Sequence, residues 1–400
     1  MNDEINGEKK PVLTKSLIIL MTIACGVCVA NLYYVQPLES QIARAFHVSQ
    51  NSAGIATMLT QIGYACGILF IVPLGDMCER RSLIMRMLLV VILALVIIAF
   101  SPNYLIMVGF MFILGITTAV PQIIVPYAAH LSPPGQQGKV IGDVMSGLLV
   151  GILLSRAFSG IVGAAFNWRV VYVLAAIMVG ILFIFIARLF PSDRQISEGT
   201  YTKLLKSIPK LVKTQVSLRE SAVNGFFMFG SFTIFWTSLI FLLETPVYNM
   251  GTREAGLLGL VGVVGALAAP LIGKVADERG PRFSVGIGVL LSTLAYVCFS
   301  IFGYDIWGLI AGAIILDLGN QCGQVSNQAR VQLLGDKMRS RNNTVFMFSY
   351  FMGGAVGSFL GTLCWQNFKW QGVCAIGIAF QAAAIIAHFI IYRPRKALNV

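Results

Sequence analysis

The stretch Gly273-Lys-Val-Ala-Asp-Glu-Arg-Gly-Pro-Arg282 lies between two long apolar segments and says more about the fold than any other part of the chain. A related stretch, Asp76-Met-Cys-Glu-Arg-Arg81, lies 201 positions earlier, measured from aspartate to aspartate. A second pair of similar stretches, Asn167-Trp-Arg169 and Lys369-Trp-Gln371, is separated by 202 positions. A nearly constant offset predicts that the chain contains two copies of one structural unit.

The composition is that of a membrane protein. Of the 400 residues, 57% are hydrophobic and 12% are charged, and the mean hydropathy is +0.80. A soluble domain has about 45–50% apolar and about 25% charged residues. So few charges cannot cover a water-facing surface, which excludes a soluble enzyme, a disordered chain and a disulfide scaffold.

Twelve apolar segments follow one another, each near the length of about 20 residues that one transmembrane helix needs. Backbone groups in lipid must be satisfied within helices or closed barrels, so each segment is expected to be helical. We therefore predict an all-α membrane protein with twelve transmembrane helices in two pseudo-symmetric six-helix halves. The segments are 16–38, 53–74, 83–101, 103–129, 139–165, 168–190, 221–243, 255–273, 283–302, 304–328, 343–365 and 370–392.

The longest polar stretch, residues 191–220, divides the chain. We predict an N-terminal half with a cytoplasmic tail over 1–190, a cytoplasmic linker over 191–220, and a C-terminal half with a short tail over 221–400. Within the linker, basic and apolar residues between Lys203 and Lys213 have roughly helical spacing. This pattern predicts a helix that lies along the membrane surface.

The basic residues predict the orientation. With the N-terminus inside, 24 of the 29 Lys and Arg residues lie in inner segments and 4 in outer segments, and Arg156 lies within a span. Because cytoplasmic loops carry the excess of Lys and Arg, both termini are expected to be cytoplasmic in a multi-pass protein of the bacterial inner membrane. The basic residues that give the net charge of +12 are then expected to interact with the lipid bilayer and not with a nucleic acid. No cleavable signal peptide is expected.

The stretch at 273–282 matches the loop signature G-x-x-x-D-x-x-G-x-[RK], and on this motif the chain resembles the major facilitator superfamily. The copy that contains Asp76 lacks both glycines. Pro73-Leu-Gly-Asp76, Val120-Pro-Gln122 and Leu316-Asp-Leu-Gly319 are similar to the bacterial twelve-helix drug:proton antiporter branch. The resemblance implies a major facilitator fold and a monomeric transporter of a small molecule that works by alternating access.

Two charged residues within apolar segments are candidates for proton coupling, because charges inside spans are costly. Asp317 is followed on one helical face by Asn320, Gln321 and Gln324, so this polar stripe is expected to face a cavity or a neighbouring helix. Asp317 can be a protonation site or a member of a structural hydrogen-bond cluster. Arg156 can be its counter-charge, can bind an anionic group of a substrate, or can extend to the outer interface.

Further substrate-cavity candidates follow from the resemblance, which implies that the first, fourth, seventh and tenth spans face the centre. These candidates are Tyr33, Gln36 and Gln122, together with Asn320, Gln321 and Gln324. Aromatic residues crowd the seventh span; they can form a pocket for an apolar substrate, but packing and lipid contact are the favoured explanation. Glu39 and Glu244 lie at the outer ends of the first and seventh spans. They can gate the outer mouth or receive protons, but exposed interfacial acids are the favoured expectation.

The charged loop residues are candidates for a cytoplasmic gate. The resemblance implies that they hold the two halves together in the outward-open state, and the alternative is that they serve only as orientation signals. The candidates are Asp76, Arg80, Arg81, Asp277 and Arg282.

The sequence thus predicts a secondary active transporter that exports a small amphipathic compound in exchange for protons. The alternative is a uniporter or importer of a polar metabolite; a membrane-embedded enzyme or sensor is disfavoured because no catalytic constellation is visible. No phosphate-binding loop is visible in the sequence, and no cofactor is expected. No metal site is expected either, because Cys25 and Cys28 lie in an apolar segment without a nearby histidine.

Overall fold

The computed structural model describes residues 13–133, 136–192, 201–335 and 338–392, and within these ranges all regular structure is helical. The first part of the chain forms α1 (Lys15–Ala30), α2 (Glu39–Phe46), α3 (Gln50–Cys66), α4 (Arg80–Ala99), α5 (Tyr104–Thr117), α6 (Pro121–Leu131), α7 (Gln137–Ala165) and α8 (Trp168–Leu189). The second part forms α9 (Tyr201–Thr214), α10 (Val216–Leu243), α11 (Thr252–Leu258), α12 (Val263–Arg279), α13 (Pro281–Phe302), α14 (Ile306–Gln332) and α15 (Arg339–Ile385).

Short helices of other types connect several of these elements. Three are 3₁₀-helices, η1 (Gln36–Leu38), η3 (Val72–Asp76) and η4 (Gly259–Gly262), and two are π-helices, η2 (Gly67–Ile71) and η6 (Ile386–Ile391).

Nine helices in the described ranges are long and apolar enough to cross a membrane, and α1 is a shorter apolar helix. The all-helical prediction is confirmed, whereas the number of twelve spans stays a prediction. The segment expected at 103–129 is divided into α5 and α6, because Pro121 lacks the backbone N–H that a continuous helix would use. The segment expected at 255–273 is divided by η4. In α15, non-helical Lys369 (φ 54°, ψ −147°) lies between the segments expected at 343–365 and 370–392.

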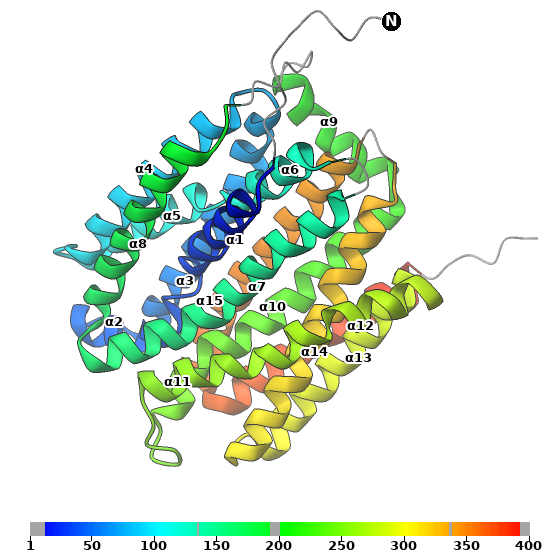
Figure 1. The fold of residues 1–400 in the computed structure, drawn as a ribbon. Helices are drawn as coiled ribbons and strands as arrows, with labels where there is room; N and C mark the ends of the chain where they lie inside the picture. Colours follow the sequence, from blue (N-terminus) through cyan, green and yellow to red (C-terminus); the bar gives the residue numbers. More distant parts are fainter. Residues whose placement is uncertain (1–12, 134–135, 193–200, 336–337, 393–400) are drawn as a thin grey trace, which may run out of the picture.

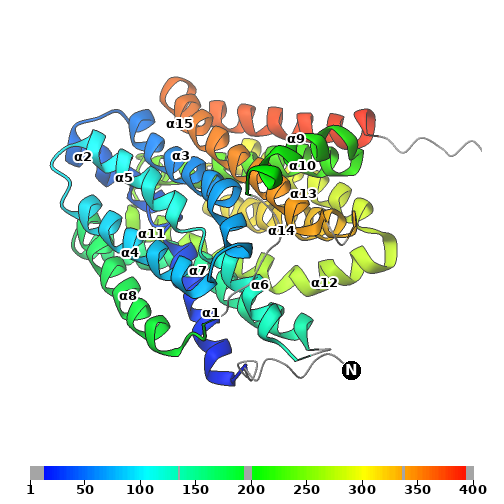
Figure 2. The ribbon, with the colours of Figure 1, turned by 90° about the horizontal axis from the view of Figure 1, so that it is seen from above.

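The helices before α9 pack mainly against one another, and so do the helices after α9. The pairs α1–α7, α3–α5 and α4–α8 are in contact in the first part, and α10–α15 and α13–α14 in the second. Figure 1 shows α4, α5 and α8 on one side of the molecule and α12, α13 and α14 on the other, and Figure 2 shows the same separation from above. The contacts α3–α15 and α7–α11 join the two parts.

Small residues allow several of these helices to approach closely, as is common in membrane proteins. Where α1 meets α7, a Cβ atom on Gly147 would lie 2.1 Å from the carbonyl oxygen of Thr22. Only glycine fits at that point of the pair.

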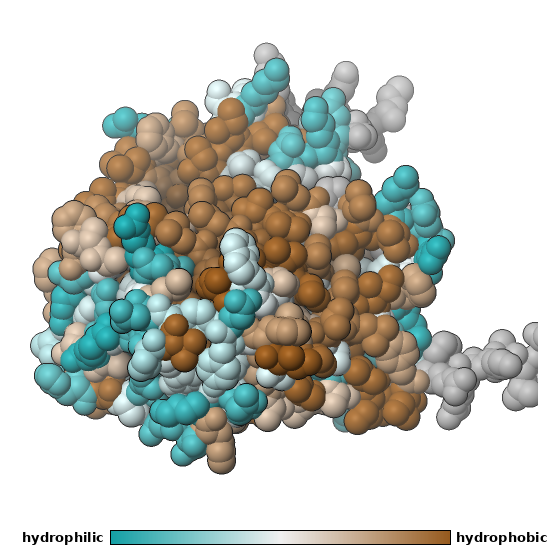
Figure 3. Space-filling view, turned by 90° about the horizontal axis from the view of Figure 1, so that it is seen from below, coloured by the Kyte–Doolittle hydropathy of each residue, from teal (hydrophilic) through white to brown (hydrophobic). Residues whose placement is uncertain are grey.

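The outer surface is widely hydrophobic, and Figure 3 shows its hydrophilic residues gathered in separate patches. Large apolar side chains such as Leu105, Leu267 and Trp307 are 79%, 75% and 73% exposed. Soluble monomers rarely expose apolar surface on this scale. Together with the apolar helices, this surface identifies a multi-pass membrane protein.

Candidate functional site

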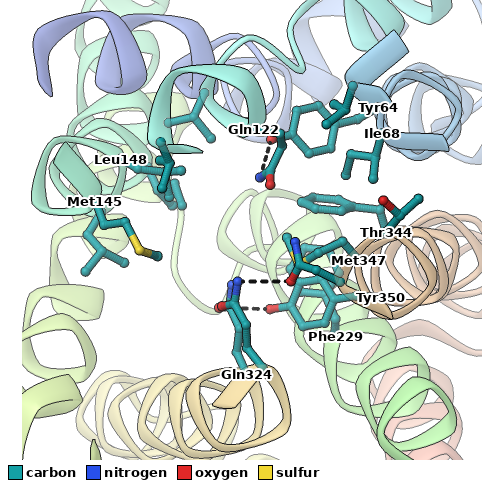
Figure 4. A pocket seen from close by; sticks show the side chains of 18 of the residues that line it. Tyr64, Ile68, Gln122, Met145, Leu148, Phe229, Gln324, Thr344, Met347 and Tyr350 are labelled. Carbon is teal, nitrogen blue, oxygen red and sulfur yellow. Dashed lines mark hydrogen bonds between the residues drawn. The ribbon is translucent and has the colours of Figure 1, made fainter. Parts of the chain in front are cut away.

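A cavity of about 570 Å³ lies between the two parts of the chain. Helices α1, α3, α6 and α7 contribute to it from one part, and α10, α14 and α15 from the other. Figure 4 shows Met145 and Leu148 of α7 on one side and Met347 and Tyr350 of α15 on the opposite side. The polar lining residues are Tyr33, Tyr64, Arg80, Gln122, Arg156, Asp317, Asn320, Gln321, Gln324, Gln328, Gln332, Arg339, Ser340, Asn343, Thr344 and Tyr350.

The two ends of the cavity differ. At one end its lining reaches Gln332 and Arg339, where α14 ends and α15 begins. At the other end, helices of the two parts touch: Gln41 Nε2 donates to Thr252 Oγ1 at 3.1 Å. Nearby, a Cβ atom on Gly256 of α11 would lie 2.7 Å from the Cα of Gly160 in α7. The cavity is therefore closed at the end where α2 and α11 lie.

Arg156 lines the cavity from α7 and is almost completely buried. Its Nε donates to Gln36 Oε1 at 2.8 Å. Gln36 itself does not line this cavity among the described residues, so it contacts the guanidinium from outside the cavity. The guanidinium carbon lies 4.2 Å from the ring centre of Trp236, 5.1 Å from Tyr33 and 5.5 Å from Phe232. Buried cation–π contacts of this kind stabilise a charge that has left water.

Asp317 enters the cavity from α14 and is 6% exposed. Its Oδ2 has no hydrogen-bond partner among the described residues, and neither has Nη2 of Arg156. A buried polar group without a partner is unusual and calls for an explanation.

The helix break η4 passes close to both of these charged side chains. A Cβ atom on Gly259 would lie 2.7 Å from Cβ of Arg156, and one on Gly262 would lie 3.3 Å from Oδ2 of Asp317. Glycine at both ends of η4 thus lets the backbone pass close to both side chains.

Amide and hydroxyl groups form a second polar set in the cavity. Asn320 Nδ2 donates to the Tyr350 hydroxyl at 3.2 Å, and that hydroxyl lies 3.3 Å from Oε1 of Gln324. Across the cavity, Gln122 Nε2 donates to the Tyr64 hydroxyl at 3.3 Å, as drawn in Figure 4. Gln321 also lines the cavity. The polar stripe predicted on α14 therefore faces a cavity.

Among the predicted gate residues whose side chains the structure describes, Arg80 lines the cavity. Arg80 Nε donates to the Gly75 carbonyl at 3.1 Å, and Arg81 donates to the Ala187 carbonyl. The side chains of Asp76 and Asp277 lie outside the described part of the structure.

Arg282 belongs to a buried cluster that the sequence analysis missed. Its Nε donates to Glu220 Oε1 at 3.0 Å, Arg330 donates to Glu220 Oε2, and His388 Nδ1 lies 3.1 Å from Oε1. The predicted linker ends at Glu220, but α10 begins at Val216 and carries this residue into the bundle. The signal available in the sequence was the apolar spacing that continues upstream of residue 221. In these contacts, Arg282 joins helices of the second part only.

One expectation for an individual side chain is wrong. Glu39 is fully buried and accepts a hydrogen bond from Thr57, because α2 turns back against α3. The expectation for the aromatic residues of α10 is correct for packing and wrong for lipid contact: Phe229, Phe232 and Trp236 are packed inside the protein, and Phe229 and Phe232 line the cavity.

Two of the cysteines, Cys25 and Cys28, are buried and free. The described residues contain no group of three or more His, Cys, Asp or Glu side chains that could hold a metal ion.

Comparisons with known proteins agree with this architecture. The family model described as Major Facilitator Superfamily matches residues 18–333 and, in a second match, residues 222–399. The chain is 37% identical over 387 residues to the putative uncharacterized transporter YgaY of Escherichia coli (strain K12), covering 97% of this chain and 98% of that protein. It is 32% identical to the probable transporter SCO4007 of Streptomyces coelicolor, covering 90% and 84%. The crystal structure of the nucleoside transporter NupG has the same fold, with a TM-score of 0.76, 13% identity, and coverage of 93% and 98%.

Proposed function

Because the chain belongs to the Major Facilitator Superfamily and is a transporter rather than an enzyme, we propose that it exports a small amphipathic compound in exchange for protons. In this proposal it is a monomer of the bacterial inner membrane, with both termini in the cytoplasm. No ATP-binding motif is visible in the sequence, so a proton gradient is the driving force that we propose.

The observation that carries the proposal is the environment of Asp317. The carboxyl group is buried in the cavity, and its Oδ2 has no hydrogen-bond partner among the described residues. A carboxyl group in this situation can take up a proton or a positively charged group of a substrate, but not both at once. In an exchanger, such competition for one site couples the movement of the proton to the movement of the substrate in the opposite direction.

Alternating access requires two units that rock against each other around the site. We propose residues 1–190 and 221–400 as these units, connected by the linker 191–220. In the linker, α9 contacts both units: the Tyr201 hydroxyl donates to the Phe70 carbonyl, and Arg341 donates to Ser207. In the state described, the cavity is closed at the end that we assign to the outside. Its other end, with Arg80, Arg81 and Arg282, is the cytoplasmic gate of this proposal, and Asp76 and Asp277 belong to that gate as well.

The second candidate is uniport or import of a polar metabolite. It is favoured by the amide groups of Asn320, Gln324 and Gln122, which could bind hydroxyl or carbonyl groups of a substrate without any change of protonation.

A proteoliposome experiment distinguishes the two candidates. Purified protein is reconstituted into liposomes that contain a pH-sensitive dye, and ethidium or an apolar amino acid is added outside with and without an imposed pH gradient. Exchange predicts proton movement that depends on the added compound and is lost in Asp317→Asn. The matched control is Asp305→Asn, because Asp305 caps the start of the same helix and asparagine also serves as a cap. Unchanged proton movement in Asp317→Asn would contradict the proposal.

A further inference from the structure

Arg156 and Asp317 line one cavity without a direct ion pair between them among the described residues. The one hydrogen bond that these residues give to the Arg156 side chain uses Nε, and Nη2 of Arg156 and Oδ2 of Asp317 both lack partners. Burying a charge without a partner is strongly unfavourable. A ligand with one anionic and one cationic group would give each of these side chains a partner.

The chemistry of each side chain defines what it can bind. A guanidinium group is planar and pairs with carboxylates through parallel N–H donors. Gln36 occupies Nε, and the rings of Trp236, Tyr33 and Phe232 surround the group. The Nη donors are thus left for an anionic group of a ligand, while the Asp317 carboxylate is an acceptor for an ammonium group.

The remaining lining defines the rest of the ligand. Met145 and Leu148 of α7 lie along one wall, opposite Met347 of α15 and Phe229 of α10. Ile152 of α7 also lines the cavity. Methionine side chains adapt to ligands of different shape. A volume of about 570 Å³ is within the range of sites for small organic molecules.

We propose that the cavity binds an α-amino acid with an apolar side chain, with its carboxylate on Arg156 and its ammonium group on Asp317. This inference rests on the proposed function and names the substrate class. It also agrees with exchange: the ammonium group and the proton compete for the same carboxylate, so the loading of one releases the other.

Equilibrium binding to the purified full-length protein tests the inference without any gradient. The probes are L-phenylalanine, N-acetyl-L-phenylalanine, which lacks the ammonium charge, and L-phenylalaninamide, which lacks the carboxylate. We expect each modified probe to bind about tenfold or more weakly than L-phenylalanine, because each loses one charge-assisted hydrogen-bonded pair. Equal binding of either modified probe would overturn the inference, as would failure of L-phenylalanine, L-leucine and L-methionine all to bind.

Two variants assign the charges. Arg156→Gln should bind L-phenylalanine as weakly as the unmodified protein binds L-phenylalaninamide. Its affinity for L-phenylalaninamide should be the same as that of the unmodified protein. Asp317→Asn should bind L-phenylalanine as weakly as the N-acetyl probe. Arg169→Gln and Asp305→Asn are the matched controls, since both residues lie outside the cavity lining. If the cavity variants fail to fold, the three probes on the unmodified protein still decide.

The outcome is separable from that of the proposed function. Selective binding of the zwitterion without proton movement in liposomes would support this inference and contradict proton exchange. Proton exchange driven by ethidium, with no amino acid bound, would support the proposed function and contradict the inference.

Discussion

Arg44 of α2 and Glu244, the residue after α10, form an ion pair across the closed end of the cavity, with 3.1 Å between Nη2 and Oε1. Ser40 of α2 also donates to Glu244. These contacts join the two parts of the chain at the end where the cavity is sealed, and they must break if this end opens.

We expect Glu244→Gln to shift the protein modestly toward conformations that are open at this end. Arg44 is 64% exposed, so the ion pair contributes no more than about 1 kcal/mol, which corresponds to an increase of up to about fivefold in the open population. Accessibility of a single engineered cysteine to a thiol reagent measures the shift. Glu254→Gln is the control, because the hydrogen bond that Glu254 accepts among the described residues comes from Gly251, at the start of its own helix α11. A decrease in accessibility would contradict the assignment.

Gly256→Ala should have a larger effect at the same end. The new Cβ would lie 2.5 Å from the Arg156 carbonyl oxygen and 2.7 Å from Cα of Gly160, and backbone atoms cannot move aside easily. We expect the closed state to be disfavoured and the transport rate to fall at least about tenfold. Gly180→Ala in α8 is the matched control: a Cβ there meets nothing within 4 Å, and alanine favours a helix by about 0.5–1 kcal/mol. Equal transport rates in the two variants would count against the close contact.

Trp236→Leu should destabilise the protein through Arg156. A desolvated cation–π contact stabilises by about 2 kcal/mol, and Trp236 makes the shortest such contact with the guanidinium. We expect a lower thermal unfolding temperature, with Trp236→Phe intermediate because phenylalanine keeps an aromatic face. Trp307→Leu is the comparison, since Trp307 is 73% exposed on the outer surface. An equal decrease in both leucine variants would mean that the contact with Arg156 is not the cause.

Glu220→Gln should destabilise the second part of the chain. Removing the carboxylate leaves Arg282 and Arg330 without their counter-charge, at a cost of about 3 kcal/mol for a buried group. Thermal unfolding measures the loss. The comparison is Glu278→Gln, because Glu278 is 62% exposed and pairs with Lys274 only at 4.0 Å, so its loss costs less than about 0.5 kcal/mol. Partial recovery in Glu220→Gln/Arg330→Met would identify the unpaired charge as the cause.

The sequence was sufficient to predict the helical class, because long apolar runs leave the backbone no other way to satisfy its hydrogen bonds in lipid. Pro121 stands at the start of α6, and a proline at this place favours the break that the structure shows between α5 and α6. The break at η4 was not predicted, since Gly259 and Gly262 interrupt an apolar run without a proline, and single glycines are common in membrane helices.

For the candidate site, helical spacing was the useful signal. Asp317, Asn320 and Gln324 recur every three or four residues, and this periodicity brings them to one face of α14, where they line the cavity. The Glu220–His388 contact could not be predicted in this way, because it joins residues 168 positions apart and no local pattern encodes such a pairing.

The close approach of Gly160 and Gly256 has a consequence for the speed of the conformational cycle. Where Gly160 of α7 meets Gly256 of α11, main chain lies against main chain, so no side chain of these two residues has to change rotamer before the helices separate. The activation barrier for opening this end is then expected to arise at the polar contacts around this point, Gln41 with Thr252 and Arg44 with Glu244.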